Sequence, residues 1–491
     1  MTVLALDAGT TGVTALLVTD DGRIAARGYE EFAQHFPRPG WVEHEPEQIW
    51  QATLSASRQA LDGSGGDAPT AVGVTNQRET AVVWDRHSLA APRRAIVWQD
   101  RRTTEVCERL RDAGHERRVS ELTGLRLDPY FTGTKLGWLA EHDTASWQGV
   151  RDGRTVIGTV DSYLVARLTA GRVHATDPSN ASRTLLYDLT TNRWSDELCA
   201  MFDVPTKALP EIRPSSGDFG RTDAGAFLGL DLPVAGIAGD QQAALFGQAC
   251  FDPGASKCTY GTGSFVLVNT GNDLVRSDAG LLTTVAWDLG DGAVYALEGA
   301  IFVTGAAIQW LRDGLRIIDT AAETDALART VDDTGGVVFV PALTGLGAPH
   351  WDPDARGAVL GLTRGTSRAH LVRAALEAIA FEVRDVVDVM VRDAGVQVPE
   401  LSVDGGASAN DLLCQLQADQ LQVAVRRPQV AETTALGAAF LAGLATGVWS
   451  STDELRDTWQ LDRRFDPGAR DDAGYARWQE AVRRSRGWAR L

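Results

Sequence analysis

Two stretches of the chain repeat the same order of apolar and polar positions. Apolar runs at residues 3–6 and 13–18 flank a turn, Asp7-Ala8-Gly9-Thr10-Thr11-Gly12, and a third run follows at 23–29. In the second half, runs at 256–260 and 264–269 flank Gly261-Thr262-Gly263, and further runs follow at 282–287 and 293–297. Each pattern predicts an antiparallel meander with a tight first turn. The repetition indicates a duplicated domain.

Both turns are suited to binding phosphate. Their small residues allow backbone N–H groups to approach an anion, and the Asp7 carboxylate can hold a hydrated Mg²⁺. Both turns lead into strands, and no G-x-x-x-x-G-K-[ST] sequence occurs, so this is neither the Rossmann nor the Walker design. Two such turns, one opening each half, predict a nucleotide bound between two domains.

A third feature lies near the middle of the chain, where the apolar run 232–238 ends in Gly239-Asp240-Gln241-Gln242. The pattern predicts a strand that delivers an acid to the start of a helix at 242–248. Acids at that edge of an α/β sheet commonly belong to a functional site. An Asp after a strand is also a common helix N-cap, so both interpretations stand at this point.

The intervening sequence predicts further elements. A helix should begin near Pro46 and reach about residue 61, since proline favours the first helical turn. After a strand at 71–75, Arg78 and Glu79 are adjacent and would point to opposite sides of a regular strand, so a shared cleft needs a bend there. Residues 103–119 are expected to form one amphipathic helix and residues 181–187 a strand.

Composition narrows the class of protein. A chain of 491 residues suits two domains, which we place at residues 1–250 and 251–491 with a hinge near 252–254. The net charge of -18 argues against nucleic acid or an anionic membrane as partner. Five scattered cysteines without a C-x-x-C pair indicate a reduced, cytoplasmic protein. The absence of a run of about 18 apolar residues predicts no integral membrane segment.

Motifs along nearly the whole chain, from Leu4 to about Trp449, then suggest a family. They are Asp7-Ala8-Gly9-Thr10-Thr11, Gly40-Trp41-Val42-Glu43-His44, Asn76-Gln77-Arg78-Glu79-Thr80, Trp98-Gln99-Asp100-Arg101-Arg102-Thr103, Asp128-Pro129-Tyr130-Phe131, Gly239-Asp240-Gln241-Gln242, Tyr260-Gly261-Thr262-Gly263, Glu298-Gly299-Ala300 and Asp404-Gly405-Gly406-Ala407. Together they resemble the FGGY carbohydrate kinases, and the runs at 76–80, 98–103 and 239–242 resemble the branch that phosphorylates glycerol.

The resemblance implies an α/β fold of two actin/hexokinase-like (ribonuclease H-like) domains with a central cleft. It implies ATP-dependent phosphorylation of glycerol to sn-glycerol 3-phosphate, with Mg²⁺ accompanying ATP, Asp240 as the base and a homo-oligomer as one possible assembly. The residues expected to bind glycerol are Arg78, Glu79, Trp98, Tyr130, Asp240, Gln241 and Phe265. The residues expected to bind the nucleotide are Thr10, Thr11, Gly12, Thr262, Gly305, Gln309, Gly406 and Asn410. Asp7 is expected to hold the metal through water.

Two departures from the family pattern stand out. Ala8 and Gly12-Val13-Thr14 replace the usual Gln and Ser-Ser-Arg, which removes a cation that faces the phosphates in the family. The loop at residues 224–229 lacks the lysine of the fructose 1,6-bisphosphate site in regulated bacterial members. We therefore expect no inhibition by that sugar.

Two other functions fit parts of the sequence. One is phosphorylation of a different polyol or a ketose, against which the Arg78-Glu79 pair and Trp98 argue, because a longer sugar needs the space they fill. The other is a non-catalytic actin-like nucleotide-binding protein, suggested only by the altered first loop. Retention of Asp7, Asp240 and Thr262 argues against it.

Overall fold

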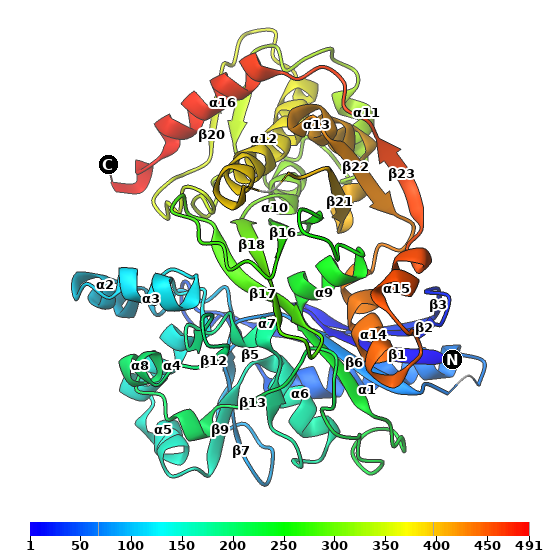
Figure 1. Cartoon of the computed structure of the whole chain (residues 1–491). Helices are drawn as coiled ribbons and strands as arrows, with labels where there is room; N and C mark the ends of the chain where they lie inside the picture. Colours follow the sequence, from blue (N-terminus) through cyan, green and yellow to red (C-terminus); the bar gives the residue numbers. More distant parts are fainter. Residues whose placement is uncertain (67, 396, 491) are drawn as a thin grey trace.

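The computed structural model describes residues 1–66, 68–395 and 397–490. It contains two large β-sheets, one in each half of the chain (Figure 1). The first has the order β14-β6-β1-β2-β3. Its strands are β1 (Thr2–Ala8), β2 (Gly12–Thr19), β3 (Ile24–Glu31), β6 (Ala71–Asn76) and β14 (Val234–Gly239).

The second sheet has the order β17-β18-β16-β15-β21-β22-β23. Its strands are β15 (Ser256–Tyr260), β16 (Ser264–Gly271), β17 (Leu282–Asp288), β18 (Ala293–Ile301), β21 (Glu400–Asp404), β22 (Ala424–Pro428) and β23 (Leu461–Phe465). In both sheets an antiparallel meander is extended by parallel strands, since β6 pairs parallel with β1 and β21 pairs parallel with β15. The two predicted meanders are confirmed, and both turns connect antiparallel strands.

Helices cover the first sheet on both faces (Figure 1). On one side, α1 (Pro46–Gly63) and α6 (Val160–Leu168) share a buried core with β1, β2 and β6. On the other side lie α9 (Asp240–Gly247) and α14 (Thr433–Thr446). Helix α14 follows the second sheet in sequence but packs against the first, in a core that also includes Leu267 and Trp287 of the second sheet. A single apolar layer therefore joins the two halves.

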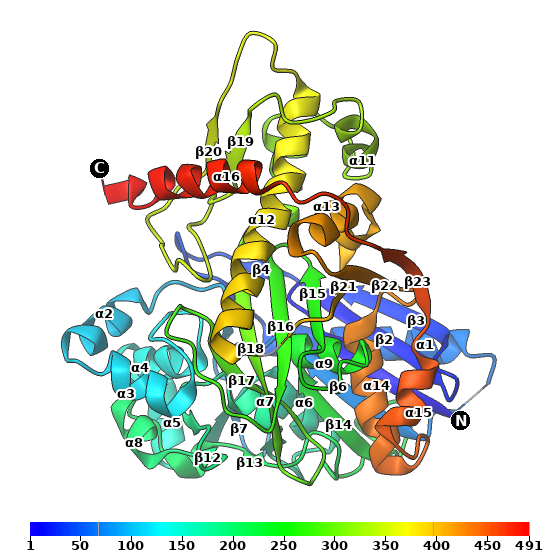
Figure 2. The ribbon, with the colours of Figure 1, turned by 45° about the horizontal axis from the view of Figure 1, so that its top comes forward.

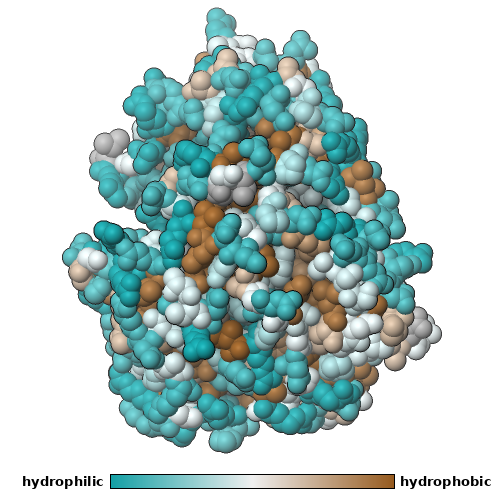
Figure 3. Space-filling view, in the orientation of Figure 1, coloured by the Kyte–Doolittle hydropathy of each residue, from teal (hydrophilic) through white to brown (hydrophobic). Residues whose placement is uncertain are grey.

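The second half has its own core around α12 (Arg368–Ala394), which crosses the sheet in Figure 2. The other helices there are α10 (Gly305–Gln309), α11 (Glu323–Ala328), α13 (Asp411–Leu421), α15 (Thr452–Thr458) and α16 (Asp472–Ser485). A helical lobe projects from the first half and comprises α2 (Thr104–Asp112), α3 (Glu116–Thr123), α4 (Thr132–His142), α5 (Thr144–Arg151) and α8 (Asp196–Met201). Above α2 and α3 the surface is indented between the halves (Figure 3).

Two predicted elements are wrong. The expected helix at 103–119 is two helices, because Gly114 takes the left-handed conformation with φ of 85° between α2 and α3. Of the residues expected to form a strand at 181–187, only Tyr187 lies in one, the short β11 (Tyr187–Asp188); Ala181 ends α7 (Pro178–Ala181), and residues 182–186 form a turn. The Asp177 carboxylate caps that helix and Pro178 opens it, which is a start signal that the apolar pattern obscured.

No helix in the described part of the chain combines the length and apolar character needed to cross a lipid bilayer.

Candidate active site

The predicted acid lies where strand β14 ends and helix α9 begins. Asp240 is the first residue of α9, and Gly239 occupies the cap position, so Asp240 is not the N-cap. Its Oδ1 lies 3.0 Å from Nε of Arg78, and its side chain keeps 29% of its surface exposed. A Cβ on Gly239 would lie 2.7 Å from the Arg78 side chain, so only glycine leaves room for this pair. Burial raises the pKa of Asp240, although the neighbouring Arg78 opposes that shift.

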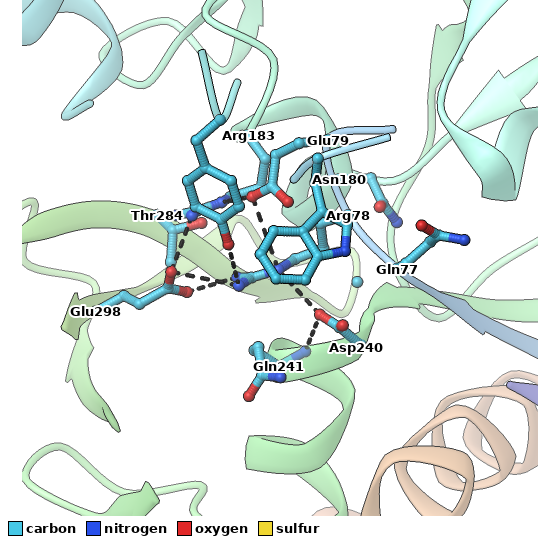
Figure 4. Close-up of polar contacts among 12 residues, drawn as sticks. Gln77, Arg78, Glu79, Asn180, Arg183, Asp240, Gln241, Thr284 and Glu298 are labelled. Atoms are coloured by element: carbon cyan, nitrogen blue, oxygen red, sulfur yellow. Dashed lines mark hydrogen bonds and ion pairs between the residues drawn. The ribbon is translucent and has the colours of Figure 1, made fainter. Parts of the chain in front are cut away.

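The bend predicted beside Arg78 is present. Glu79 has a φ of 59°, in the left-handed region that residues with side chains rarely adopt. This conformation follows the end of β6 and turns the Arg78 and Glu79 side chains into the same region (Figure 4). Such backbone strain persists when the surroundings fix it, and here Thr132 donates to the Glu79 carbonyl oxygen at 3.1 Å.

Two residues complete a buried charge cluster: Arg183, which no sequence pattern indicated, and Glu298, which belongs to a family motif but was not among the predicted site residues. Arg183 Nε donates to Glu79 Oε1 at 2.7 Å, and its Nη2 donates to Glu298 Oε1 at 2.9 Å. Glu298 also pairs with Arg78, and the side chains of Arg183 and Glu298 are fully buried. Burial acts to raise the pKa of Glu298, but the two arginines outweigh it and leave the pKa below its usual value. We call Arg78, Glu79, Arg183 and Glu298 the charge cluster.

Three aromatic rings lie beside the charge cluster. The Trp98 ring is 5.6 Å from that of Tyr130 and 6.5 Å from that of Phe265, both edge to face. Phe265 belongs to β16, so the second half of the chain supplies one ring. The buried Lys135 fixes the backbone at Tyr130, because its Nζ donates to the carbonyl oxygens of Pro129 and Tyr130. The structure thus brings Arg78, Glu79, Trp98, Tyr130, Asp240 and Phe265 together.

The side chain of Gln241, which is also predicted to bind glycerol, does not join this group of residues. Its backbone N–H donates to Asp240 Oδ1 at 2.7 Å, but its side-chain oxygen accepts from Lys257, a buried lysine of β15. In Figure 4 the Gln241 side chain extends away from Arg78 and Glu79. Its side-chain nitrogen remains available as a donor, and its predicted contact with substrate stays a prediction.

The first predicted phosphate loop joins β1 to β2. Asp7 is half-buried near the end of β1. Burial, and after it the charge of Asp240, raises the pKa of Asp7 to about 7. The two carboxylates therefore lie close enough to repel each other. Thr10 accepts a hydrogen bond from Trp98 Nε1 at 3.0 Å, which connects this loop to the aromatic rings, and Thr11 is exposed.

The second loop, at residues 261–263, is fixed by the start of helix α10. The Gly305 N–H donates to the Gly261 carbonyl oxygen at 3.0 Å, and the Ala306 N–H donates to the Thr262 carbonyl oxygen at 3.1 Å. A Cβ on Gly305 would approach the Gly261 oxygen to 2.6 Å, so a glycine is needed for this contact. Thr262 and Gln309 are exposed.

The remaining nucleotide residues lie beside the second loop. Gly405 packs against the carbonyl of Tyr260, the residue before this loop. The exposed Gly406 lines a cavity of about 530 Å³ between residues 403–409 and 427–432. Asn410 caps α13, because its side-chain oxygen accepts from Leu413 N–H at 2.9 Å, and its amide nitrogen donates to Thr324 at 3.0 Å. One N–H of that amide remains for a ligand.

Comparisons with known proteins agree with this architecture. Residues 2–247 match the family model for the FGGY family of carbohydrate kinases, N-terminal domain, and residues 256–446 match its C-terminal domain. The chain is 52% identical to a glycerol kinase of Xanthomonas axonopodis pv. citri, over 99% of this chain and 98% of that protein. It is 50% identical to glycerol kinase 2 of Thermotoga maritima, over 99% of each chain.

Solved structures give the same picture. The crystal structure of Plasmodium falciparum glycerol kinase with ADP is 34% identical and superposes with a TM-score of 0.91, covering 99% of this chain and 98% of that one. A xylulose kinase from Rhodospirillum rubrum is 26% identical, with a TM-score of 0.84 over 99% of this chain and 97% of its own. The predicted fold class is confirmed, and the chain belongs to the FGGY family of carbohydrate kinases.

Proposed function

We propose that this chain transfers the γ-phosphoryl group of ATP to glycerol, giving sn-glycerol 3-phosphate. One observation carries the proposal: the Asp240 carboxylate stands at the end of β14, partly exposed and paired with Arg78, beside both the aromatic rings and the first phosphate loop. The identity of 50 to 52% to proteins named glycerol kinase supports glycerol as the acceptor.

The chemistry of these side chains suits a small triol. Arg78, Glu79 and Tyr130 offer polar atoms, and Trp98 with Phe265 offers an apolar wall for the carbon backbone. Such a combination fixes both the position and the orientation of a small polar ligand. Because the charge cluster is held by internal ion pairs, these side chains are ordered before the substrate binds.

Asp240 accepts the proton of the attacking hydroxyl. Burial raises its pKa, and a carboxylate with a raised pKa is a stronger base at neutral pH. Arg78 holds the carboxylate in place with the 3.0 Å contact. As in phosphoryl transfer generally, most of the rate comes from positioning the reactants and neutralising charge. The N–H groups of the two loops supply part of that neutralisation on the phosphate oxygens.

A Mg²⁺ ion that accompanies ATP would fit beside two carboxylates of this site. Asp7 and Asp240 are close enough for the charge of Asp240 to raise the pKa of Asp7, and a divalent cation between them would relieve that repulsion. Asp7 would hold the ion through water. When bound with ATP, the ion neutralises charge on the phosphate oxygens.

The experiment is coupled ADP release with Mg-ATP, with and without glycerol, for the wild type and Asp240→Asn. We expect glycerol-dependent turnover in the wild type and a fall of about 10²- to 10⁴-fold in the variant, because the base is lost. Asp231→Asn is the matched control, since this exposed carboxylate pairs with Arg221 at the surface.

The rival functions predict other results. Turnover with erythritol or xylulose but not with glycerol would show that the acceptor is a different polyol or a ketose. The proposed mechanism of phosphoryl transfer would then still stand. Nucleotide binding without turnover on any polyol would favour a non-catalytic protein.

A further inference from the structure

The last residue of the first phosphate loop, Gly12, lies directly against the phenol of Tyr29. A Cβ on Gly12 would be 2.8 Å from the Tyr29 hydroxyl oxygen and 2.6 Å from the carbonyl oxygen of Glu30. No side chain fits at position 12 unless the backbone moves. The Tyr29 hydroxyl therefore takes the space that a side chain of the loop would otherwise fill.

Strand register places this phenol on the same face as the metal-binding candidate. Thr14 of β2 pairs directly with Asp7 of β1 on one side and with Tyr29 of β3 on the other. Directly opposed residues of antiparallel strands project to one face of the sheet. Arg27 is two residues along β3 and so shares that face, and its guanidinium carbon lies 5.8 Å from the centre of the Tyr29 ring.

Both side chains are accessible to a ligand. Tyr29 is 38% exposed, and within the described chain its hydroxyl has no hydrogen-bond partner. The Arg27 side chain is 54% exposed, and its ion pair with Glu432 is long, at 3.8 Å from Nε. Glu432 lines the cavity beside Gly405 and Gly406, so Arg27 lies between the first loop and that cavity.

We propose that Tyr29 and Arg27 bind the terminal phosphates of the nucleotide, in place of the cation missing from position 14. The Tyr29 O–H donates to a phosphate oxygen, and the Arg27 guanidinium leaves Glu432 to pair with the same group. Hydrogen bonds to a charged oxygen are short and about twice as strong as neutral ones. This inference rests on the proposed function, because it assigns contacts to the same phosphates.

The test measures nucleotide binding by calorimetry, without acceptor turnover. Tyr29→Phe removes only the hydroxyl, and Arg27→Gln removes the charge but keeps a polar side chain. We expect each variant to bind a non-hydrolysable ATP analogue with Mg²⁺ about ten-fold more weakly and to bind AMP unchanged. The control is Arg23→Gln, because this exposed arginine pairs with Asp21 at the far end of β3.

Two results would overturn the proposal. The first is unchanged affinity for the ATP analogue in both variants. The second is an equal loss for AMP and the analogue, because the contact would then not involve the terminal phosphates. Thermal unfolding of each variant separates a binding effect from misfolding, since Tyr29→Phe keeps the ring carbon Cε2, which a Cβ on Gly12 would meet at 2.9 Å. A wild type that binds the analogue but never phosphorylates glycerol would contradict the proposed function alone.

Discussion

The two sides of the proposed site, one for the acceptor and one for the phosphates, are built from different kinds of group. On the acceptor side, long charged and aromatic side chains form ion pairs with each other, as Arg183 does with Glu79 and Glu298. On the phosphate side, short turns present backbone groups, and glycines such as Gly305 permit close contacts of backbone with backbone. Most side chains there are exposed or half-exposed.

The difference matches the two ligands. A small uncharged triol offers only hydroxyls, so several side chains must surround it and exclude water. A triphosphate brings its own charge, so we propose that a few N–H groups, a metal ion and the half-exposed Arg27 are enough to bind it. The acceptor side should therefore be sensitive to loss of charge in its interior, and the phosphate side to added volume at its turns.

The largest effect is expected from Arg183→Met. Removing the guanidinium leaves the buried carboxylates of Glu79 and Glu298 with Arg78 alone, which should destabilise the fold by about 3–5 kcal/mol. Urea unfolding measures the change, and glycerol-dependent turnover should disappear with it. Arg172→Met is the control, because this exposed arginine pairs with Asp223 at the surface and should cost less than about 1 kcal/mol. Equal losses in the two variants would contradict the role given to the charge cluster.

Added volume on the phosphate side is tested by Gly305→Ala. The new Cβ would press on the Gly261 oxygen and displace the second loop, which should lower kcat/KM for ATP by about 10- to 100-fold. KM for glycerol should stay unchanged, because the acceptor residues do not contact Gly305. Gly365→Ala is the matched control, since its Cβ would meet only the Thr363 side chain at 3.7 Å. A rise in KM for glycerol alone would reverse the assignment of the two sides.

A smaller, pH-dependent effect is expected at Lys135. Burial lowers the pKa of this lysine from 10.5 to about 7, although Glu79, Asp100 and Asp128 oppose the shift. Between those pH values the unfolded chain binds a proton that the folded chain releases, so this group makes the fold more stable as pH rises above 7. From pH 7 to 9, the free energy of unfolding of the wild type should therefore gain about 1–2 kcal/mol relative to Lys135→Met.

The control for this measurement is Lys207→Met, because Lys207 is exposed. The comparison separates the loss of a buried lysine from the loss of an exposed one. Urea unfolding at several pH values gives both curves, and parallel curves for wild type and Lys135→Met would count against a shifted lysine.

The smallest effect concerns regulation. Millimolar fructose 1,6-bisphosphate should leave the rate unchanged, because the loop at 224–229 has no lysine and the arginines beside it are paired, Arg172 with Asp223 and Arg221 with Asp231. Initial rates with and without the sugar test this expectation. Clear inhibition would show that another part of the chain binds it.

The sequence by itself determined the parts of this protein that depend on neighbouring residues. The alternation of apolar and polar positions predicted both meanders, and the small residues between strands predicted both turns. The run ending at Gly239 placed Asp240 at the carboxyl edge of a strand, where the structure has it. These features follow from strand period and turn geometry, which act over a few residues.

Only the tertiary structure decided which charges meet. Arg183 lies 104 residues from Glu79, and Arg78 lies 220 residues from Glu298, so no local pattern connects them. A strand was expected at 181–187, but Arg183 lies in the turn that follows α7, from which its side chain reaches both Glu79 and Glu298. A buried ion must find its partner wherever the fold brings one, because an unpaired charge in the interior is too costly. That choice depends on how distant segments pack, and here it completes the charge cluster.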